Sequence, residues 1–267
     1  MNIGFLGAGN MGGAILRGFY ANKKTEDNLF VFGVNLEKLQ RTCQETGATP
    51  CTEIEDLVEK CDIFFIGVKP KIFDEVLPKV KKTYTKDKIC VSMAAGISIA
   101  EIESFLGDDA PIVRIMPNTP AQVREAMTSV SVNKNVNGNK LKPVMEILEG
   151  IGKAEIVDEE LIHTVIGVSG SSPAYTYMYI DGLIKAAVSE GMEPDKARVF
   201  AAQAVLGAAK MVLENKDISP EQLRINVCSP GGTTIQAVEK FMELGFEDII
   251  AKGFKAATNK SREMENN

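Results

Sequence analysis

The sequence lacks the residues that several common catalytic sites require. It has a single histidine, His163, in a mostly apolar stretch, and no Gly-x-Ser-x-Gly segment. A Ser–His–Asp hydrolase is therefore excluded. A lone histidine in such surroundings is more often a packed residue than a catalyst. No group of His, Cys or carboxylate residues has the spacing of metal ligands, so we expect no metal.

Cysteine patterns that mark disulfides or zinc are missing as well. The chain has five cysteines, an odd number, and no Cys-x-x-Cys pair. We therefore predict reduced thiols and a cytoplasmic protein. The N-terminus shows no basic segment before an apolar run, so we expect no signal peptide. No apolar run approaches the ~18 residues of a membrane span, and we expect no membrane association.

An excess of positive charge is also absent. Lys and Arg number 30 against 36 Asp and Glu, which gives a formal net charge of -6. Nothing in this balance favours nucleic acid or an anionic membrane, and groups that bind a small anion must be local. The length of 267 residues suits one or two domains with cores of their own.

What the first half does contain is an alternation of strand-like and helix-like segments. Short apolar runs lie at 3–6, 29–34 and 63–68, and "ICVSMAA" and "IVRIMP" follow with helical stretches between them. Continuous apolar strands separated by helices are typical of a parallel sheet covered on both faces. The pattern predicts an α/β fold with an N-terminal Rossmann-type, doubly wound sheet.

The pattern changes after about residue 160. "AYTYMYIDGLIKAAVSEGM" and "ARVFAAQAVLGAAKMVLEN" are long and helical, and no comparable β-rich run follows. We predict a dinucleotide-binding domain over 1–160 and an all-α domain over 161–267. The second helical segment is apolar or small around most of its circumference, so most of it must be buried. A domain of this size cannot easily cover it alone, which predicts a dimer or a ring of dimers.

The segment "GFLGAGNMGGAI" contains the spacing Gly7-x-Gly9-x-x-Gly12 between the first strand and the first helix. In that context Gly7 allows the tight turn and Gly9 lets a pyrophosphate approach the backbone. Gly12 lets helix and strand pack closely, and the helix N-terminus faces the phosphates. The alternative is a tight turn with no ligand. We predict dinucleotide binding because spacing, context and position agree.

The end of the second strand bears on the choice of cofactor. An NAD site usually has Asp or Glu there to bind the ribose hydroxyls, whereas this chain has Asn35. No carboxylate repels a 2′-phosphate, and Lys38 and Arg41 are the nearest cations. We expect NADPH, with NADH use left open.

Three further segments follow predicted strands and so converge on the same edge of the sheet. They are "GVKPK" at 67–71, "MAAGIS" at 93–98 and "MPNTP" at 116–120. Ligands of such folds bind beyond the carboxyl ends of the strands. Lys69 directly after a buried strand is predicted to belong to the site rather than to be an ordinary exposed lysine. Asn118 between two prolines is either a polar tip at the site or a plain turn.

Together these segments resemble the pyrroline-5-carboxylate reductase family over nearly the whole chain. The likeness rests on "GFLGAGNM", "VKP", "MAAGI" and "RIMPNTP", and on "SGSSPAY" at 169–175 and "SPGGTTIQAV" at 229–238, of which the last is the most specific. The resemblance implies a Rossmann domain and a helical domain that exchanges helices with a partner subunit. It also implies hydride transfer from NAD(P)H to the C=N bond of pyrroline-5-carboxylate, which yields proline.

The resemblance also assigns site residues. It implies that the cofactor is lined by Asn10, Met11, Asn35, Val68, Lys69, Pro70, Ala94 and Asn118. It places Ser229, Gly232, Thr233 and Thr234 on the substrate loop. The chain departs from the family pattern at Ser172 and Ala126, where glycine is usual, and these two replacements bear on local backbone geometry.

The chemistry of "SPGGTT" fits a carboxylate substrate. A carboxylate is well held by backbone N–H groups at a helix start, and the pattern from Ile235 onward is helical. Gly231 and Gly232 allow close approach, and Thr233 and Thr234 add hydroxyls. The alternative is a helix cap with a glycine hinge. We expect Thr234 and Ser229 to act in catalysis, with positioning as the main effect because a protonated imine accepts hydride without a strong acid.

Two other functions are compatible with a dinucleotide-binding fold. A β-hydroxyacid dehydrogenase normally needs a lysine in its second domain, but Lys185 and Lys210 lie in no such motif. A non-catalytic, dinucleotide-sensing regulator would keep the fold and lose the chemistry, and the intact "SPGGTT" argues against it.

Overall fold

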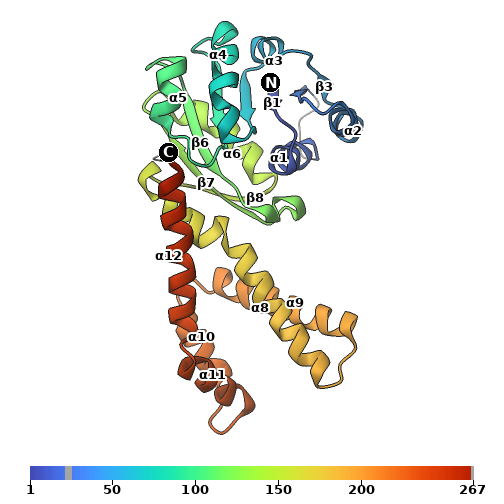
Figure 1. Ribbon diagram of the computed structural model, residues 1–267, viewed down its shortest axis with the longest axis vertical. Helices are drawn as coiled ribbons and strands as arrows, with labels where there is room; N and C mark the ends of the chain where they lie inside the picture. Colours follow the sequence, from blue (N-terminus) through green and yellow to red (C-terminus); the bar gives the residue numbers. More distant parts are fainter. Residues whose placement is uncertain (22–25, 266–267) are drawn as a thin grey trace. The chain divides into compact units, whose positions relative to one another are not determined.

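The computed structural model describes residues 1–21 and 26–265. The chain forms two compact units. The first comprises Met1–Ser171 together with Ala257–Asn267, and the second comprises Ser172–Ala256 (Figure 1). The boundary that we predicted near residue 160 thus lies before the helical turns that lead into the second unit.

The first unit is built on an eight-stranded sheet in the order β3-β2-β1-β4-β5-β6-β7-β8. The strands are β1 (Asn2–Leu6), β2 (Asn28–Phe32), β3 (Thr49–Pro50), β4 (Ile63–Ile66), β5 (Ile89–Ser92), β6 (Ile112–Met116), β7 (Ala126–Val132) and β8 (Gly152–Ile156). All pairs are parallel except β6 with β7. The order reverses between β1 and β4, the position at which such sheets bind ligands.

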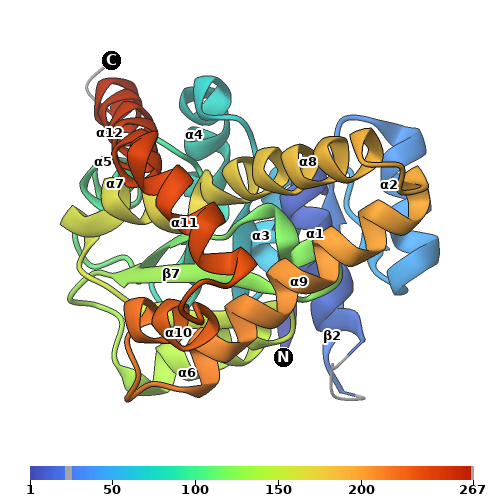
Figure 2. The same ribbon diagram turned by 90° about the horizontal axis from the view of Figure 1, so that it is seen from below.

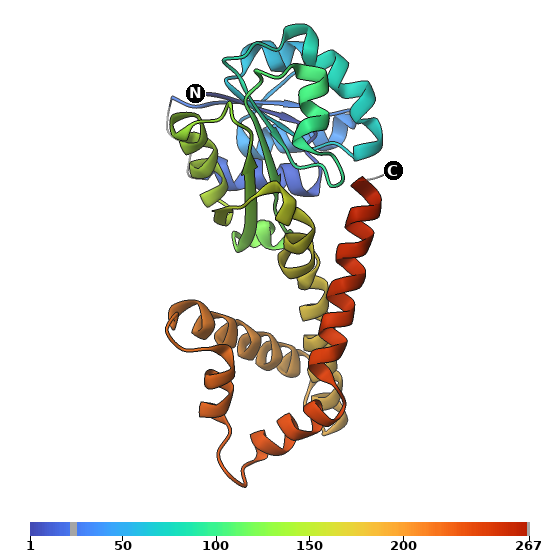
Figure 3. The same cartoon turned by 90° about the vertical axis from the view of Figure 1, so that its left-hand side faces the viewer.

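Helices cover both faces of this sheet (Figure 3). One apolar core joins the sheet to α1 (Asn10–Tyr20), α2 (Leu36–Thr46) and α6 (Gly138–Glu149). The other joins it to α3 (Ile54–Lys60), α4 (Phe73–Thr83) and α5 (Ile99–Leu106). In β4, Ile63 and Phe65 belong to the first core and Phe64 and Ile66 to the second. This alternation explains why a strand buried on both faces reads as an unbroken apolar run.

Strands β7 and β8 were not anticipated from the sequence. In β7 the polar residues Thr128, Ser129 and Ser131 are buried, which breaks the apolar run that marks the other strands. Its antiparallel pairing with β6 places Ser131 opposite Arg114. Strand β8 is an edge strand with largely exposed residues, so its composition gives little signal.

The second unit is entirely helical. It contains α8 (Ser172–Ser189), α9 (Pro194–Glu214), α10 (Pro220–Val227), α11 (Thr233–Glu243) and the first part of α12 (Phe246–Glu265). Helices α8 and α9 lie side by side (Figure 2). The prediction of a largely parallel Rossmann-type sheet followed by an all-α region is confirmed. No helix in the described part of the chain combines the length and apolar character needed to cross a membrane.

Large apolar side chains of the second unit are exposed in the single chain. Met178 is 76% exposed, Val199 65% and Phe200 64%. Helices α8, α10 and α11 contain no buried residue, and the buried residues of α9 are Ala197 and Ala201. These helices therefore do not build a core of ordinary density on their own.

Short helical turns link the sheet to this unit. They are the 3₁₀ turn η3 (Glu159–Leu161), α7 (Ile162–Val165) and a π-helical turn, η4 (Ile166–Gly170). Two more 3₁₀ turns, η1 (Pro70–Ile72) and η2 (Thr119–Val123), follow β4 and β6.

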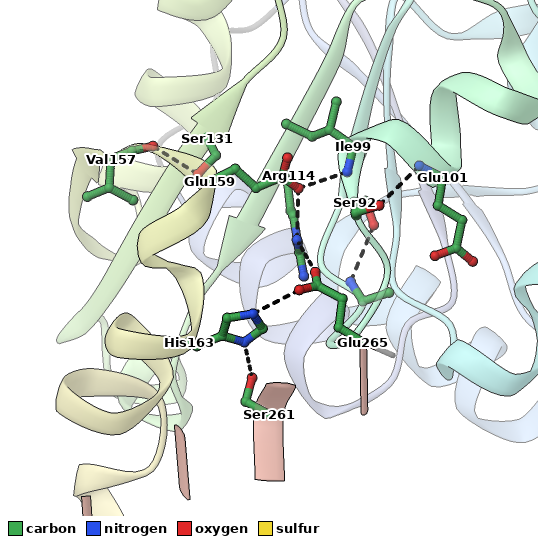
Figure 4. Close-up of polar contacts among 12 residues, drawn as sticks. Ser92, Ile99, Glu101, Arg114, Ser131, Val157, Glu159, His163, Ser261 and Glu265 are labelled. Carbon is green, nitrogen blue, oxygen red and sulfur yellow. Dashed lines mark hydrogen bonds and ion pairs between the residues drawn. The ribbon is translucent and has the colours of Figure 1, made fainter. Parts of the chain in front are cut away.

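A buried arginine ties the end of α12 to the sheet (Figure 4). Arg114 on β6 is 1% exposed, and its Nη1 donates to carboxylate oxygens of Glu159 and Glu265, both at 2.8 Å. His163 binds the other oxygen of Glu265 at 2.8 Å and the hydroxyl of Ser261 at 2.9 Å. The lone histidine thus has two polar partners within the first unit, as expected of a packed residue.

Candidate active site

The glycine-rich turn between β1 and α1 is fixed by backbone geometry. Gly7 has φ +95°, and a Cβ there would lie 2.8 Å from the carbonyl oxygen of Gly67. A Cβ on Gly12 would collide with the carbonyl oxygen of Gly7. The Gly7 N–H donates to the Phe32 carbonyl at 2.9 Å, which joins the turn to the end of β2. Gly7 and Gly12 are therefore required by the protein's own packing.

Gly9 differs, because a Cβ at this position would meet no atom within 4 Å. Gly9 is the N-cap of α1, and no side chain caps this helix end or places a carboxylate in its first turn. Open space above a glycine at an uncapped helix start is the arrangement that admits a phosphate to backbone N–H groups. Asn10 and Met11 begin the helix beside it. The turn fits a dinucleotide pyrophosphate.

The end of β2 leads into α2 through Asn35. The Asn35 side chain accepts a hydrogen bond from the Lys38 N–H at 2.9 Å and so caps α2. Its exposed amide lies at the position where an NAD site usually has a carboxylate. The residue therefore has a structural role, and its contact with a cofactor stays a prediction.

The segments after β4 and β5 lie at the same edge of the sheet as the glycine-rich turn, since these strands are parallel to β1. Lys69 is exposed and is the N-cap of η1, with Val68 and Pro70 half-buried on either side. Ala94 is buried, and its N–H approaches the Ser92 hydroxyl at 3.4 Å.

Asn118 follows β6 and is buried. Its amide donates to the Ser169 carbonyl at 3.0 Å, and its carbonyl oxygen accepts from the Met127 N–H at 3.0 Å. The side chain thus connects the end of β6 to β7 and to the π-helical turn. These two contacts fix the orientation of the side chain and leave one amide N–H and one lone pair of its oxygen for a ligand.

A cavity of about 660 Å³ adjoins the glycine-rich turn. It is lined by Ala8, Gly9, Asn10, Ala14, Arg17, Gly18, Lys38, Arg41, Thr42, Glu45, Ala121, Gln122 and Arg124. These residues come from the glycine-rich turn, α1, α2 and the segment at η2. Its size suits a substantial part of a dinucleotide.

Basic side chains dominate the charged lining of this cavity. Glu45 is bound by Arg41 at 2.8 Å and by Arg17 at 3.4 Å. The hydrogen bond from Arg41, with the charges of both arginines, lowers the pKa of the Glu45 carboxyl, so it stays ionised. Lys38 and Arg41 were noted from the sequence. Arg17 and Arg124 were not, although Asn10, Ala14 and Arg17 share one face of α1 by their spacing.

The predicted substrate loop lies in the second unit, between α10 and α11. Gly231 has φ +70°, and the Gly232 N–H donates to the Ser229 carbonyl at 3.0 Å. Gly232 is the N-cap of α11, again without a side-chain cap or an acidic first turn. Thr233 and Thr234 open the helix, and Thr234 is half-buried. Backbone N–H groups at such an uncapped helix start are able to hold a carboxylate.

The two predicted sets of site residues fall in different units. The cofactor residues are gathered at one edge of the sheet in the first unit, and residues 229–234 lie in the second. Within residues 1–21 and 26–265, no group of three or more His, Cys, Asp or Glu residues is placed to hold a metal ion. Cys51, Cys61 and Cys90 are buried in the first unit as free thiols.

Known proteins resemble nearly the whole chain. Residues 159–264 match the family model described as pyrroline-5-carboxylate reductase dimerisation, and residues 2–96 match that described as NADP oxidoreductase coenzyme F420-dependent. The chain is 41% identical over 263 residues to the pyrroline-5-carboxylate reductase of Escherichia coli, covering 98% of this chain and 97% of that protein.

Two solved structures are similar over the same extent. The pyrroline-5-carboxylate reductase of Coxiella burnetii aligns with a TM-score of 0.91 and 33% identity, covering 98% of each chain. The pyrroline carboxylate reductase of Plasmodium falciparum, solved with NADP bound, aligns with a TM-score of 0.87 and 31% identity. It covers 99% of this chain and 98% of that one. The similarity includes both the sheet unit and the helical unit.

Proposed function

The chain belongs to the pyrroline-5-carboxylate reductase family, and from this we propose that it reduces the C=N bond of 1-pyrroline-5-carboxylate to L-proline with NADPH. This is the last step of proline biosynthesis. The observation that carries the proposal is 41% identity over 98% of the chain, joined to an open glycine-rich turn of dinucleotide-binding geometry. NADPH is supported by the NADP-bound relative and by Asn35 in place of a carboxylate. Use of NADH stays open.

We propose that the carboxyl edge of the sheet holds the cofactor. The N–H groups at the start of α1 face the pyrophosphate above Gly9, while Gly7 and Gly12 shape the turn. The remaining cofactor contacts are assigned to Asn10, Met11, Asn35, Val68, Lys69, Pro70, Ala94 and Asn118. The support is their position around one edge of one sheet.

The loop at 229–234 is proposed to hold the substrate. N–H groups at the start of α11 face the substrate carboxylate, and Gly231 and Gly232 let it approach. Thr233 adds a hydroxyl at the helix start. Support comes from the uncapped N-terminus of α11 and the positive φ of Gly231.

The chemistry then requires little from side chains. The reduced nicotinamide supplies a hydride, which forms a C–H bond at the imine carbon while the C=N π electrons move to nitrogen. A ring nitrogen that is already protonated accepts those electrons without a further acid. Thr234 and Ser229 orient the ring and exclude alternative poses, so positioning provides most of the rate enhancement.

The helical region is proposed to complete the enzyme by dimerisation. The match of residues 159–264 to a dimerisation model supports an oligomer, and the exposed apolar side chains of α8 and α9 support burial against a partner. We propose that the two subunits exchange helices and that dimers can assemble further into a ring.

We also propose 1–160 as the dinucleotide-binding domain and 161–267 as the dimerisation and substrate domain. The five free cysteines favour a cytoplasmic enzyme.

The test follows the absorbance of NADPH. Its oxidation is measured with pyrroline-5-carboxylate and with a panel of β-oxo acids, and its formation from NADP⁺ is measured with the matching β-hydroxy acids. We expect turnover with the imino acid alone. Reduction of the oxo acids by NADPH, or oxidation of the hydroxy acids by NADP⁺, without turnover of the imino acid would assign the chain to β-hydroxyacid dehydrogenase chemistry. Cofactor binding without turnover of any substrate would indicate a dinucleotide-sensing regulator.

A further inference from the structure

The cavity beside the glycine-rich turn has an unusual charge pattern for a protein with an overall negative charge. Four basic side chains line it, those of Arg17, Lys38, Arg41 and Arg124, against the carboxylate of Glu45. The neighbouring carboxylates Glu37 and Glu125 are exposed and are not part of the lining. A local excess of positive charge in a concave surface is the electrostatic signature of an anion site.

Two of these cations have no protein partner to explain them. Glu45 is shared by Arg17 and Arg41. Within the described ranges, the side chains of Lys38 and Arg124 form no hydrogen bond or ion pair. The cavity therefore keeps positive charge that the described protein groups do not neutralise.

The backbone at Arg124 is a second, independent observation. Arg124 has φ +62° and ψ +30°, and it is the one non-glycine residue with positive φ among those described. This left-handed conformation is uncommon for a residue with a long side chain, whereas glycine adopts it freely. Its N–H caps the η2 turn through the carbonyl of Ala121. Glycine would adopt this backbone conformation at a lower conformational free energy. We therefore infer that the guanidinium of Arg124 has a function.

The position of the cavity indicates which anion it meets. Its wall includes Ala8, Gly9 and Asn10 of the dinucleotide turn. Lys38 lies in the first turn of α2, and this helix begins directly after Asn35, near the position of the adenosine ribose of a dinucleotide. A 2′-phosphate on that ribose is a dianion for most of the physiological pH range and requires cations close by.

We propose that Lys38 and Arg124, aided by the surplus charge of Arg17 and Arg41 over Glu45, bind the 2′-phosphate of NADP(H) and set the preference for it over NAD(H). This inference rests on the proposed dinucleotide site. Its specific content is that residues of α2 and of the turn after β6 act together on one phosphate, rather than the residues at 36 and 37 that directly follow Asn35.

Calorimetric titration with two fragments of the cofactor isolates this contact. The probes are 2′,5′-ADP, which carries the phosphate, and 5′-AMP, which lacks it. We expect the unmodified protein to bind 2′,5′-ADP at least about tenfold more tightly. Lys38→Gln and Arg124→Gln should each weaken 2′,5′-ADP binding by about tenfold and change 5′-AMP binding by less than about twofold. Lys142→Gln, at an exposed lysine of α6 outside the cavity, is the matched control and should change neither.

Three outcomes decide the matter. Loss of selectivity in both variants supports the subsite, and rescue by Lys38→Arg would show that charge is the cause. Unchanged 2′,5′-ADP binding in both variants, or equal weakening of both probes, overturns it. If neither probe binds the unmodified protein, the dinucleotide site itself is wrong, which separates failure of this inference from failure of the proposed function.

Discussion

Arg114 and Glu265 are 151 positions apart in the sequence, yet the arginine donates a 2.8 Å hydrogen bond to the glutamate carboxylate. The contact joins the middle of β6 to the last described turn of α12. Because Arg114 is buried, its charge depends on Glu265 and Glu159 for compensation. The end of the chain is thereby bound to the sheet that carries the predicted cofactor site.

Removing this contact should lower stability. In Glu265→Gln the carboxylate that serves both Arg114 and His163 becomes neutral, so we expect a loss of about 1–3 kcal/mol. Each kcal/mol corresponds to about 2–4 °C in the thermal midpoint for a chain of this size class. Lys240→Gln, which breaks the exposed Lys240–Glu243 pair, is the control and should leave the midpoint nearly unchanged. Equal midpoints for both variants would show that the buried contact contributes nothing.

Gly9 and Gly12 should respond differently to a side chain. Gly9→Val places its side chain in open space, so the protein should fold with an almost unchanged thermal midpoint. The variant should lose NADPH binding, as measured by the change in NADPH fluorescence or by calorimetry. Gly12→Ala forces a methyl against the Gly7 carbonyl and should lower the midpoint as well. Retention of tight NADPH binding in the folded Gly9→Val variant would contradict the assignment of the turn.

Thr234 should affect the imino acid and not the cofactor. Loss of one hydrogen bond to a charged substrate costs about 1.5–3 kcal/mol, or roughly ten- to hundredfold in kcat/KM. We therefore expect Thr234→Ala to raise KM for pyrroline-5-carboxylate and to leave the Kd for NADPH nearly unchanged. His163→Gln, tested in parallel, should retain kcat/KM because this histidine binds Glu265 and Ser261. The reverse pattern would exchange the roles of the two residues.

The buried thiols should resist alkylation in the folded protein. Burial raises the pKa of Cys51 to about 11 and of Cys61 to about 12, and burial also raises the pKa of Cys90. Almost no thiolate then exists at these sites at pH 8. Iodoacetamide at pH 8 should modify Cys228 and Cys43 first, and all five cysteines only in denaturant, as read by mass spectrometry.

The same shifts predict a pH dependence of stability. A thiol whose folded pKa is raised keeps its proton when the unfolded chain releases it, above the ordinary value of 9.0. The contribution to stability is complete below that value and is lost as the pH rises through the folded pKa, about 11 for Cys51 and about 12 for Cys61. The unfolding free energy should therefore fall over this window, and replacement of Cys61 by Ser should reduce the slope. An unfolding free energy that does not change with pH over this window would contradict the raised pKa values of the buried thiols.

The oligomer should persist at low protein concentration. Since the helices of the second unit expose large apolar side chains in the single chain, light scattering should find a dimer or a multiple of dimers even in dilute solution. An active monomer would contradict it.

Much of the fold could be predicted from the sequence because strands that are buried on both faces consist mainly of apolar residues. Ile63–Ile66 and Ile112–Met116 are examples. Strand β7 was missed because its buried positions include Thr128, Ser129 and Ser131. The Ser131 hydroxyl donates to the Val157 carbonyl at 2.9 Å, directly after β8, and the local sequence gives no sign of this partner. The contact of Arg114 with Glu265 has no local signal at all, since it depends on the path of the whole chain.

The site shows the same division. Gly7, Gly9 and Gly12 are recognisable because turn geometry imposes their spacing, and the structure separates their roles by what a Cβ would meet. Arg124 could not be assigned, since neither its left-handed backbone nor its place in the cavity wall is encoded in neighbouring residues. The assignments of individual ligand contacts stay predictions.

The most direct test is the transfer of the hydride itself. The enzyme is incubated with pyrroline-5-carboxylate and NADPH deuterated at the transferable position of the nicotinamide, using each of the two stereoisomers, and the product is examined by mass spectrometry. Reduction of the C=N bond predicts L-proline that carries deuterium on the former imine carbon with one stereoisomer and not with the other. Absence of proline, or proline without deuterium from either form, would contradict reduction of the imine by this chain.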